Sequence, residues 1–398
     1  MHFDSDYMNI CHPLILQRMQ EMQDRQMPGY GTDPISQSAR QKIRALCDCP
    51  DAEVQFLCGG TQTNMVMVNY LLRSFEGVLC ADSAHVAVHE SGAIEFTGHK
   101  VLTLPSTQGK ITAEQVDDYV TTYYSDPNWP HIVPPGMVYI THPTEYGTLY
   151  TLSEMEAISA VCRKHHLPLY LDGARLGYGL GASGVSVNGQ WSMVNAEGIA
   201  RGSSAVVPGS PMGNEEMHSL HSNGADFKEP RERSGNSQLP TLPDIARLCE
   251  AFYIGGTKCG TMFGEAAVIP RPKPDSRFFT HVKRHGALIA KGWTTALQFD
   301  TLLEGDTLTA TPYYQGCRHA IVEAMRLRQA LIDKGYKLPY HSPTNQQFVE
   351  VSLEQAARLK EHLTYDQWEP PHGDRVTIRF ATSWATRSED IDRLIDLL

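Results

Sequence analysis

The chain has 398 residues, 41% of them hydrophobic, enough to bury the cores of one large α/β domain and a smaller second domain. Its formal net charge of −11, without a long Lys/Arg run, argues against a nucleic acid or an anionic membrane as partner and favours a small-molecule substrate. Nine cysteines without a Cys-x-x-Cys pair argue against a disulfide framework, and the absence of a signal-peptide or membrane-spanning pattern leads us to expect a cytoplasmic protein.

The first 45 residues predict a helical segment, with a helix near Pro13–Met27. Between residues 46 and 270, short apolar strands alternate with amphipathic helices, the pattern of a mainly parallel sheet with helices on both faces. We therefore predict a large α/β domain over residues 46–270. Its expected strands are Glu53–Cys58, Gly77–Cys80, Met137–Thr141, Leu167–Leu171, Ala251–Ile254 and Ala266–Ile269.

Helix starts inside this domain have recognisable N-terminal signals. Thr112 is followed three residues later by Gln115, and Thr151 by Glu154, the spacing of a capping box. Thr241 is placed to be the N-cap of a later helix. We expect these helices to have a structural role and not to contribute to the functional site.

The remaining segments differ in character. Residues 185–239 are rich in Gly, Ser, Asn, Pro and charge, which predicts a polar, disordered insertion in the large domain. After residue 270, a helical region is followed by strands near Phe348–Val351 and Val376–Phe380 and by a closing amphipathic helix. This pattern predicts a smaller α+β domain over residues 271–398.

A lysine and an aspartate follow two of the predicted strands. In Gly255-Gly256-Thr257-Lys258, a lysine leaves the end of a buried strand, where desolvation lowers the pKa of the ammonium and frees the amine to attack a carbonyl. Asp172 ends another strand, and a carboxylate favours the protonated form of a pyridine ring beside it. Each residue alone also fits an ordinary turn or a helix cap. Together they predict a pyridoxal 5'-phosphate (PLP) site.

A possible phosphate site follows the first predicted strand. Gly59-Gly60-Thr61 opens a helix, and the free N–H groups and dipole at a helix start attract a phosphate. No Gly-Lys-Ser/Thr follows, so this is not a Walker loop. By themselves these residues fit a phosphate site and a plain strand-to-helix turn equally well.

Two histidines follow the strand Gly77–Cys80. On a helix, His85 and His89 share a face next to Glu90, which also matches half of a metal site. No third ligand is apparent, and we predict no metal. In a cofactor site, one imidazole would lie flat on the ring while the other handles a proton near neutral pH, although a structural role is the more common one for a single histidine.

The stretch Gly179-Leu-Gly181-Ala-Ser-Gly184 has the spacing of a dinucleotide-binding motif, and Glu197 lies downstream. A dinucleotide site needs a helix after the glycines, whereas a Gly/Ser-rich polar stretch stands there in this chain. We therefore do not expect a dinucleotide.

Taken in order, five motifs resemble the low-specificity L-threonine aldolases, a branch of the fold-type I PLP enzymes with the aspartate aminotransferase superfold. They are Gly60-Thr61-x-x-Asn64, Ala-Asp-x-Ala-His85 with Glu90, Leu-Asp172-Gly-Ala-Arg175-Leu, Lys258, and Ile-Arg379-Phe. The resemblance covers nearly all of the chain outside residues 185–237. The lysine motif departs from the Ser-x-x-Lys-Gly of that family, and the region around His142 matches only loosely, so the substrate preference is open.

The resemblance implies a role for each of these residues. Lys258 would carry PLP covalently, Asp172 would pair with the ring nitrogen, and His85 would stack on the ring. Gly60 and Thr61 would hold the phosphate, and Arg175 would lie by the ring oxygen. Arg379 would bind the substrate carboxylate as a bidentate fork. The candidates for the catalytic base are His85, His89 and His142.

The function implied is PLP-dependent cleavage of L-threonine and related β-hydroxy-α-amino acids to glycine and an aldehyde, in a homodimer or homotetramer. The alternatives are a β-eliminating lyase, an aminotransferase, or a non-catalytic binding protein of the same fold, because the cofactor-binding residues do not decide which bond breaks. The preferred aldehyde and the stereoselectivity at Cβ are left open by the sequence.

Overall fold

The computed structural model describes residues 1–183 and 238–398. Seven strands form one sheet in the order β1-β7-β6-β5-β4-β2-β3, and three form a second sheet in the order β8-β10-β9. Only β7 runs against the other strands of the large sheet, so that sheet is mainly parallel, as predicted. Its strands are β1 Glu53–Leu57, β2 Gly77–Ala81, β3 Val101–Leu104, β4 Pro135–Thr141, β5 Leu169–Asp172, β6 Ala251–Gly255 and β7 Glu265–Ile269.

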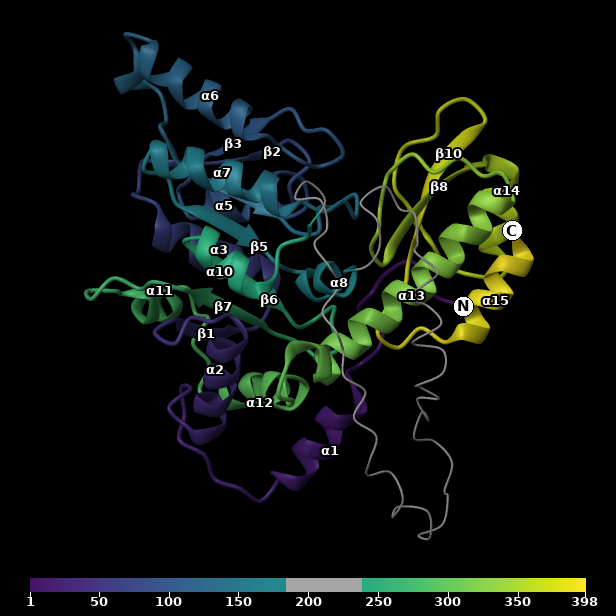
Figure 1. The fold of residues 1–398 in the computed structure, drawn as a ribbon, viewed down its shortest axis with the longest axis horizontal. Coiled ribbons are helices and arrows are strands. Elements are labelled where there is room, and N and C mark those ends of the chain that lie inside the picture. Colours follow the sequence, from purple (N-terminus) through teal and green to yellow (C-terminus); the bar gives the residue numbers. More distant parts are fainter. Residues whose placement is uncertain (184–237) are drawn as a thin grey trace.

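Helices pack on both faces of the large sheet, which confirms the predicted α/β class (Figure 1). The helices of the first part of the chain are α1 Pro13–Glu21, α2 Pro34–Leu46, α3 Gly60–Leu71, α4 His85–Val88, α5 Ala93–Phe96, α6 Ala113–Ser125, the 3₁₀ turn η1 Trp129–His131, α7 Leu152–Lys164 and α8 Leu176–Gly181. Those after residue 237 are α10 Leu242–Leu248, α11 Phe278–Arg284, α12 Trp293–Leu302, the 3₁₀ turn η3 Leu308–Ala310 and α13 Pro312–Asp333.

The small body contains β8 Gln346–Ser352, α14 Leu353–Lys360, β9 Asp366–Gln367, β10 Arg375–Ala381 and α15 Ser388–Leu397. Both chain termini lie beside it in Figure 1, and α13 runs between the two bodies. The N-terminal segment, residues 1–12, also joins the small sheet, since the Phe3 N–H donates to the Thr364 carbonyl at 3.0 Å and the Ala381 N–H donates to the Phe3 carbonyl at 2.8 Å.

The capping signals are confirmed. Thr112, Thr151 and Thr241 each begin a helix with a reciprocal capping box, to Gln115, Glu154 and Asp244 respectively. Each box satisfies two N–H groups that otherwise lack an acceptor inside the helix.

Several element boundaries differ from the prediction. The N-terminal helix ends at Glu21, a second helix covers Pro34–Leu46, and the strand Val101–Leu104 has no counterpart in the prediction. The strand expected from Leu167 begins at Leu169, because the Leu167 N–H donates back to the Cys162 carbonyl at the end of α7 and Pro168 has no N–H to give.

The hydrophobic cores bear on the expected domain boundary at residue 271. Phe278, Phe299 and Ile321 pack in the core of the large sheet, whereas Leu327 and Leu331 pack in the core of the small one. The two cores therefore meet within α13, and we propose a boundary there in place of residue 271. All but the last two residues of the expected insertion at 185–239 lie outside the described residues. Within the described ranges, no helix is both long and apolar enough to cross a membrane.

Candidate active site

Five of the six strands that run in the same direction bring site residues to one edge of the large sheet. β1, β2, β4, β5 and β6 run in the same direction, so the residues after them meet there, as ligand-binding residues do in open α/β sheets. These residues include Gly60, His85, His142, Asp172 and Lys258. The group at this edge, together with Arg175 and Arg379, is called the strand-end site.

Two glycines let the ends of β5 and β6 approach closely. A Cβ on Gly173 would lie 1.9 Å from the Tyr253 carbonyl oxygen, and one on Gly255 would lie 2.3 Å from the Ala174 carbonyl oxygen. The Gly255 N–H donates to the Gly173 carbonyl at 2.9 Å. Only glycine allows this contact, which places Asp172 and the turn carrying Lys258 side by side.

Asp172 is a buried carboxylate with four donors. Oδ1 accepts from the Tyr253 hydroxyl at 2.5 Å and from the Ala174 N–H at 3.0 Å. Oδ2 accepts from the Tyr139 hydroxyl at 2.6 Å and from the Asn64 amide at 2.9 Å. Burial acts to raise the pKa of Asp172, but the attraction of His85 and these donors outweigh it and hold the pKa below its ordinary value. The carboxyl is therefore ionised at neutral pH.

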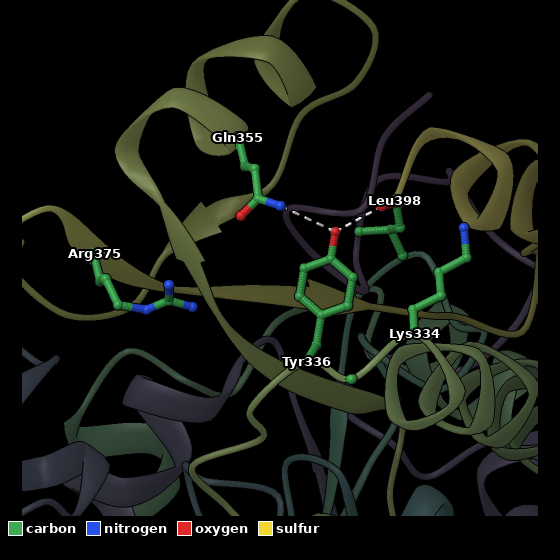
Figure 2. A pocket seen from close by; sticks show the side chains of 6 residues that line it. Lys334, Tyr336, Gln355, Arg375 and Leu398 are labelled. Atoms are coloured by element: carbon green, nitrogen blue, oxygen red, sulfur yellow. Dashed lines mark hydrogen bonds between the residues drawn. The ribbon is translucent and has the colours of Figure 1, made fainter.

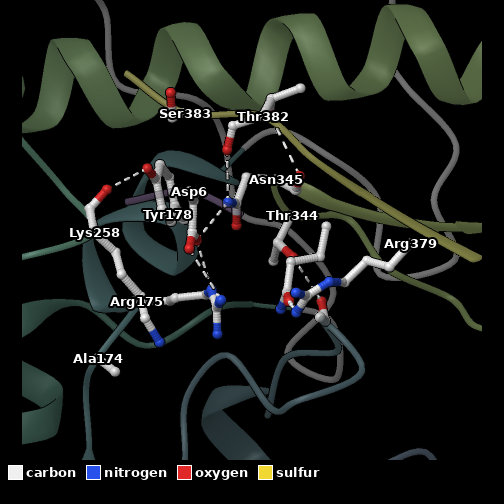
Figure 3. A network of polar contacts seen from close by, with 12 residues as sticks. Asp6, Ala174, Arg175, Tyr178, Lys258, Thr344, Asn345, Arg379, Thr382 and Ser383 are labelled. Carbon is white, nitrogen blue, oxygen red and sulfur yellow. Dashed lines mark hydrogen bonds and ion pairs between the residues drawn. The ribbon is translucent and has the colours of Figure 1, made fainter. Parts of the chain in front are cut away.

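Lys258 lies in a tight turn between β6 and β7. The Tyr178 hydroxyl donates to the Lys258 carbonyl at 2.5 Å, while the side chain extends toward Arg175 and Ala174 (Figure 3). Burial and the positive charge of Arg175 lower the pKa of the ammonium, and Asp6 and Asp172 act in the opposite direction. The net shift favours the neutral, nucleophilic amine.

Glu265 supports this turn from the first position of β7. Its carboxyl accepts from the Gly256 N–H at 2.9 Å and from the Thr257 hydroxyl at 2.8 Å, and the Gly264 N–H donates to the same hydroxyl at 3.0 Å. Burial raises the pKa of Glu265 to about 8. The turn is thus fixed by side-chain and backbone bonds on both strands.

Arg175 and Arg379 bring two guanidinium groups to the same place. Arg175 forms a bidentate ion pair with the fully buried side chain of Asp6, at 2.6 and 3.0 Å. Arg379, on β10, donates to Gln346 at 2.7 Å, pairs with Asp366 at 2.8 Å and stacks over the Trp368 ring at 5.0 Å.

Among the described residues, the buried Nε of Arg379 finds no hydrogen-bond acceptor. Burial and the charge of Arg175 lower the pKa of this guanidinium. A donor left unpaired in a cationic site is a suitable partner for a carboxylate.

His85 and His89 lie together at this edge, with ring centroids 5.6 Å apart. The Nδ1 of His85 is 2.8 Å from the fully buried Glu90 carboxylate, which also accepts from Asn64 at 2.7 Å. Burial, followed by the charges of His85 and Arg379, lowers the pKa of His89. The His89 ring is therefore mainly neutral at neutral pH and able to accept a proton.

His142 is held differently. Its backbone N–H donates to the Asp172 carbonyl at 2.9 Å, but its ring packs beside Tyr150 and Gly179. The Nδ1 of this ring is buried and has no hydrogen-bond partner in the part of the chain that the structure describes. Burial, with help from Lys110, lowers the pKa of His142 to about 4. No contact among the described residues joins its ring to Lys258 or to the carboxylate of Asp172.

The start of α3 has the features expected for an anion. Gly59 is the N-cap and offers no side-chain cap, so the first N–H groups of this twelve-residue helix lack an intrahelical acceptor. A Cβ on Gly60 would lie 3.3 Å from the Tyr253 hydroxyl, the group that also binds Asp172. Thr61 is exposed beside it.

These residues fit PLP. An ionised carboxylate, a lysine with a lowered pKa, uncapped N–H groups and an unpaired guanidinium nitrogen meet at one edge, each matching one polar part of the cofactor or of an amino acid bound to it. Among residues 1–183 and 238–398, no group of three metal-binding side chains is arranged to hold an ion.

The glycines of the dinucleotide-like motif have a packing role. Gly179 and Gly181 are buried in α8, and a Cβ on Gly181 would lie 3.2 Å from the Arg318 backbone nitrogen on α13. Gly184 lies outside the described residues.

Sequence reasoning missed three residues of this site. Asp6 lies 169 positions before Arg175, in a segment predicted as helical, and no local signal marks it. Tyr139 and Tyr253 sit inside apolar strands and resemble ordinary core residues. Their position two residues from a strand end, on the face shared with the site, is the signal that would have found them.

Residues 3–196 match the model of the family described as Beta-eliminating lyase. The low specificity L-threonine aldolase of Pseudomonas sp. (strain NCIMB 10558) is 36% identical over 176 residues, which are 44% of this chain and 49% of that protein. The chain thus spans about half the length of the curated relatives it matches.

Similarity to solved structures extends further. The Leishmania major threonine aldolase matches with a TM-score of 0.80 and 33% identity, over 100% of this chain and 98% of that chain. The Sphingomonas wittichii serine palmitoyltransferase matches with a TM-score of 0.61 and 14% identity, over 100% and 86% of the respective chains, a likeness of fold alone.

Proposed function

Because this chain belongs to the threonine aldolase family, we propose that it is a PLP-dependent carbon–carbon lyase that cleaves L-threonine and related β-hydroxy-α-amino acids to glycine and an aldehyde. The observation that carries the proposal is the pairing of Lys258 and Asp172 at the ends of adjacent strands, next to two arginines. The PLP-enzyme fold agrees with it.

The cofactor would be held by residues that approach it from four elements. Lys258 would bind it covalently, Asp172 would contact the ring nitrogen, His85 would cover a ring face, and Gly60 and Thr61 would donate to the phosphate. When bound, PLP supplies an electron sink for the bond that breaks. Asp172 is suited to its part because it stays ionised beside a cationic ring nitrogen.

Substrate binding is assigned to Arg379. Its unpaired Nε and its lowered pKa favour a negative partner, and the Trp368 ring fixes the plane of the guanidinium. A carboxylate held at this point would fix the orientation of the amino acid, and orientation decides which bond at Cα lies in line for cleavage.

The base that takes the β-hydroxyl proton is assigned to His89. Among the three candidate histidines it is the most exposed, and burial, His85 and Arg379 favour its neutral form. The His85 ring is bound to Glu90, and the His142 ring packs against Tyr150. His85 is therefore better placed to support the cofactor, and His142 to support the fold.

We further place the enzyme in the cytoplasm as a homodimer or homotetramer. Tyr7, Met8 and Ile10 are exposed apolar residues in the N-terminal segment, close in sequence to Asp6 of the site. Exposed apolar residues this close together along the chain favour contact with a second protein surface.

A second candidate is β-elimination, which the matching family description favours. The products separate the two reactions. Threonine cleaved by an aldolase gives glycine and acetaldehyde, whereas β-elimination from threonine or serine gives ammonia and a keto acid. An aminotransferase would need an added keto acid.

The test is a visible spectrum of the protein purified with PLP, recorded before and after adding threonine, with detection of aldehyde and glycine. Growth of both products, lost in Lys258→Ala, supports the proposal. Ammonia and keto acid in their place would replace aldolase by elimination. A protein that never takes up PLP would overturn both.

A further inference from the structure

The N-terminal segment, residues 1–12, crosses the strand-end site. Its first part is bonded to the small sheet through Phe3, and its last part is bonded to the Lys258 turn, where the His12 N–H donates to the Gly260 carbonyl at 2.8 Å. Asp6 lies between these two anchors. Figure 3 shows its side chain between Arg175 and Asn345, near Lys258.

Asp6 contacts both bodies of the molecule. Its carboxylate accepts two hydrogen bonds from Arg175, after β5 of the large sheet, at 2.6 and 3.0 Å. It also accepts one from the amide of Asn345, next to β8 of the small sheet, at 2.9 Å. The Asp6 side chain is fully buried and that of Arg175 is 12% exposed, so the pair is screened little by water.

The charges around this pair are mostly positive. The charge of Arg175 lowers the pKa of both Lys258 and Arg379. Burial acts to raise the pKa of Asp6, but Arg175 and Lys258 hold it down, to about 2. Asp6 is therefore ionised at neutral pH, close to two arginines and a lysine.

We propose that Asp6 is a positioning residue that fixes the guanidinium of Arg175 beside Lys258 and offsets its charge there. The fixed guanidinium then faces the place of the cofactor ring, and the Lys258 amine is kept from an excess of positive charge. The inference rests on the proposed function only for the identity of the group that Arg175 and Lys258 would hold.

A purely structural role for Asp6 predicts a different result. If Asp6 only joined the two bodies, its substitution would affect Lys258 only through weakened folding, as a destabilising substitution elsewhere would. A positioning role instead requires that removing the negative charge and removing the positive charge move the titration of Lys258 in opposite directions. The charged neighbours that face Lys258 are Arg175, Asp6, Asp172 and Glu265.

The experiment measures the reactivity of Lys258 in the cofactor-free full-length protein. Acetic anhydride acylates neutral amines, and mass spectrometry of the peptide that carries Lys258 gives the acylation rate at each pH, with the exposed Lys273 as internal reference. In Asp6→Asn, the midpoint should move to lower pH and the rate at pH 7.5 should rise by roughly threefold to tenfold, because one pKa unit is a tenfold change in neutral amine.

Two further variants complete the test. Arg175→Gln should move the midpoint to higher pH and slow acylation, and Asp6→Glu should stay close to the wild type because the charge is kept. The control is Asp33→Asn, which removes the same charge from a buried carboxylate that caps α2, and should leave Lys258 unchanged. If Asp6→Asn does not fold, Asp6→Ser removes the same charge and is compared with Arg175→Gln in its place.

The inference is overturned if Asp6→Asn leaves the midpoint where it was, if Asp33→Asn moves it equally, or if Arg175→Gln moves it downward. These outcomes are independent of catalysis. If the variants show the opposite shifts but the protein does not cleave threonine, the role of Asp6 is supported and the proposed function is contradicted. If the protein cleaves threonine but the shifts are absent, the proposed function is supported and the role of Asp6 is contradicted.

Discussion

Two cationic regions of this molecule differ in how their charges are held. In the strand-end site, Lys258, Arg175 and Arg379 are wholly or partly buried, and their surroundings shift the pKa of each. The other region, here called the C-terminal pocket, is a surface hollow lined by Lys334, Gly335, Tyr336, Gln355, Arg375 and Leu398 (Figure 2).

The charges of the C-terminal pocket are occupied by nearby protein groups. Lys334 donates to the Ile395 carbonyl at 2.7 Å, Arg375 pairs with Glu350 at 2.7 Å, and the Tyr336 hydroxyl donates to the Leu398 carbonyl at 2.6 Å. A hollow with cations is therefore not by itself a site. The strand-end site differs because its charged groups are buried, and burial lets neighbouring charges shift their pKa values.

The largest effect that separates the two regions is expected from their lysines. Lys258→Ala should abolish the visible absorption of the lysine-bound cofactor and nearly all threonine cleavage, because Lys258 is the buried amine that lies near Asp172 and Arg175. Lys334→Ala in the C-terminal pocket should keep both. Visible spectra and aldehyde release are measured for both variants. Normal turnover in Lys258→Ala would contradict the assignment of Lys258 as the lysine that binds PLP.

Asp172→Ala should lower kcat by on the order of a hundredfold or more, because the ring nitrogen loses the anion that keeps it protonated. It should also destabilise the fold by about 1–3 kcal/mol for each hydroxyl left without an acceptor, those of Tyr139 and Tyr253. Steady-state kinetics and urea unfolding measure the two parts. An unchanged kcat in a folded Asp172→Ala protein would contradict the role.

Two arginines four residues apart on β10 provide a matched pair, one in each region. Arg379→Gln should raise KM for threonine by roughly tenfold to a hundredfold, the value of a lost charge-assisted bond to a carboxylate. Arg375→Gln should leave KM unchanged, because that side chain is occupied by Glu350. Equal changes in both variants would show that the effect comes from the strand and not from substrate binding.

The smallest effect concerns acid stability. The pKa of Asp6 is about 2 in the folded protein, below the value of about 3.9 in an unfolded chain. Its ionisation therefore contributes stability that is fully present above the unfolded pKa and lost as pH falls through the folded pKa, about 2–3 kcal/mol in all.

Urea unfolding of the wild type and of Asp6→Asn at pH 5, 4, 3 and 2 measures this contribution. The free energy of unfolding should fall less steeply in the variant over that window. Glu350→Gln, which removes a partly exposed paired carboxylate near the C-terminal pocket, should change the slope less because solvent screens that charge more than the buried Asp6. Parallel curves for the wild type and Asp6→Asn would contradict the low pKa.

The sequence predicted those site residues that stand at strand ends. Lys258 and Asp172 each end a recognisable apolar run, and parallel strands deliver the residues after them to one edge whatever the details of packing. Helix starts at Thr112 and Thr151 were equally recognisable, because a capping box is a local contact. The strand Val101–Leu104 was missed because it lies at the edge of the sheet, where the exposed polar Thr103 interrupts its apolar run.

Residues that depend on distant contacts could not be predicted. Asp6 gains its role only when the chain brings residues 6, 175 and 345 together, and nothing near it in sequence marks the encounter. The sequence did not show which of the three candidate histidines is the catalytic base. The fold bears on this choice because it places the His142 ring against Tyr150.

The amino-acid sequence by itself thus determined six of the seven strands of the large sheet, its mainly parallel direction and the chemistry offered at its carboxyl edge, because periodicity, caps and strand ends are properties of neighbouring residues. The tertiary structure decided which charges are buried together, and therefore which groups have altered acidity. Desolvation and Coulomb energy depend on distance and depth, and these exist only once the chain has folded.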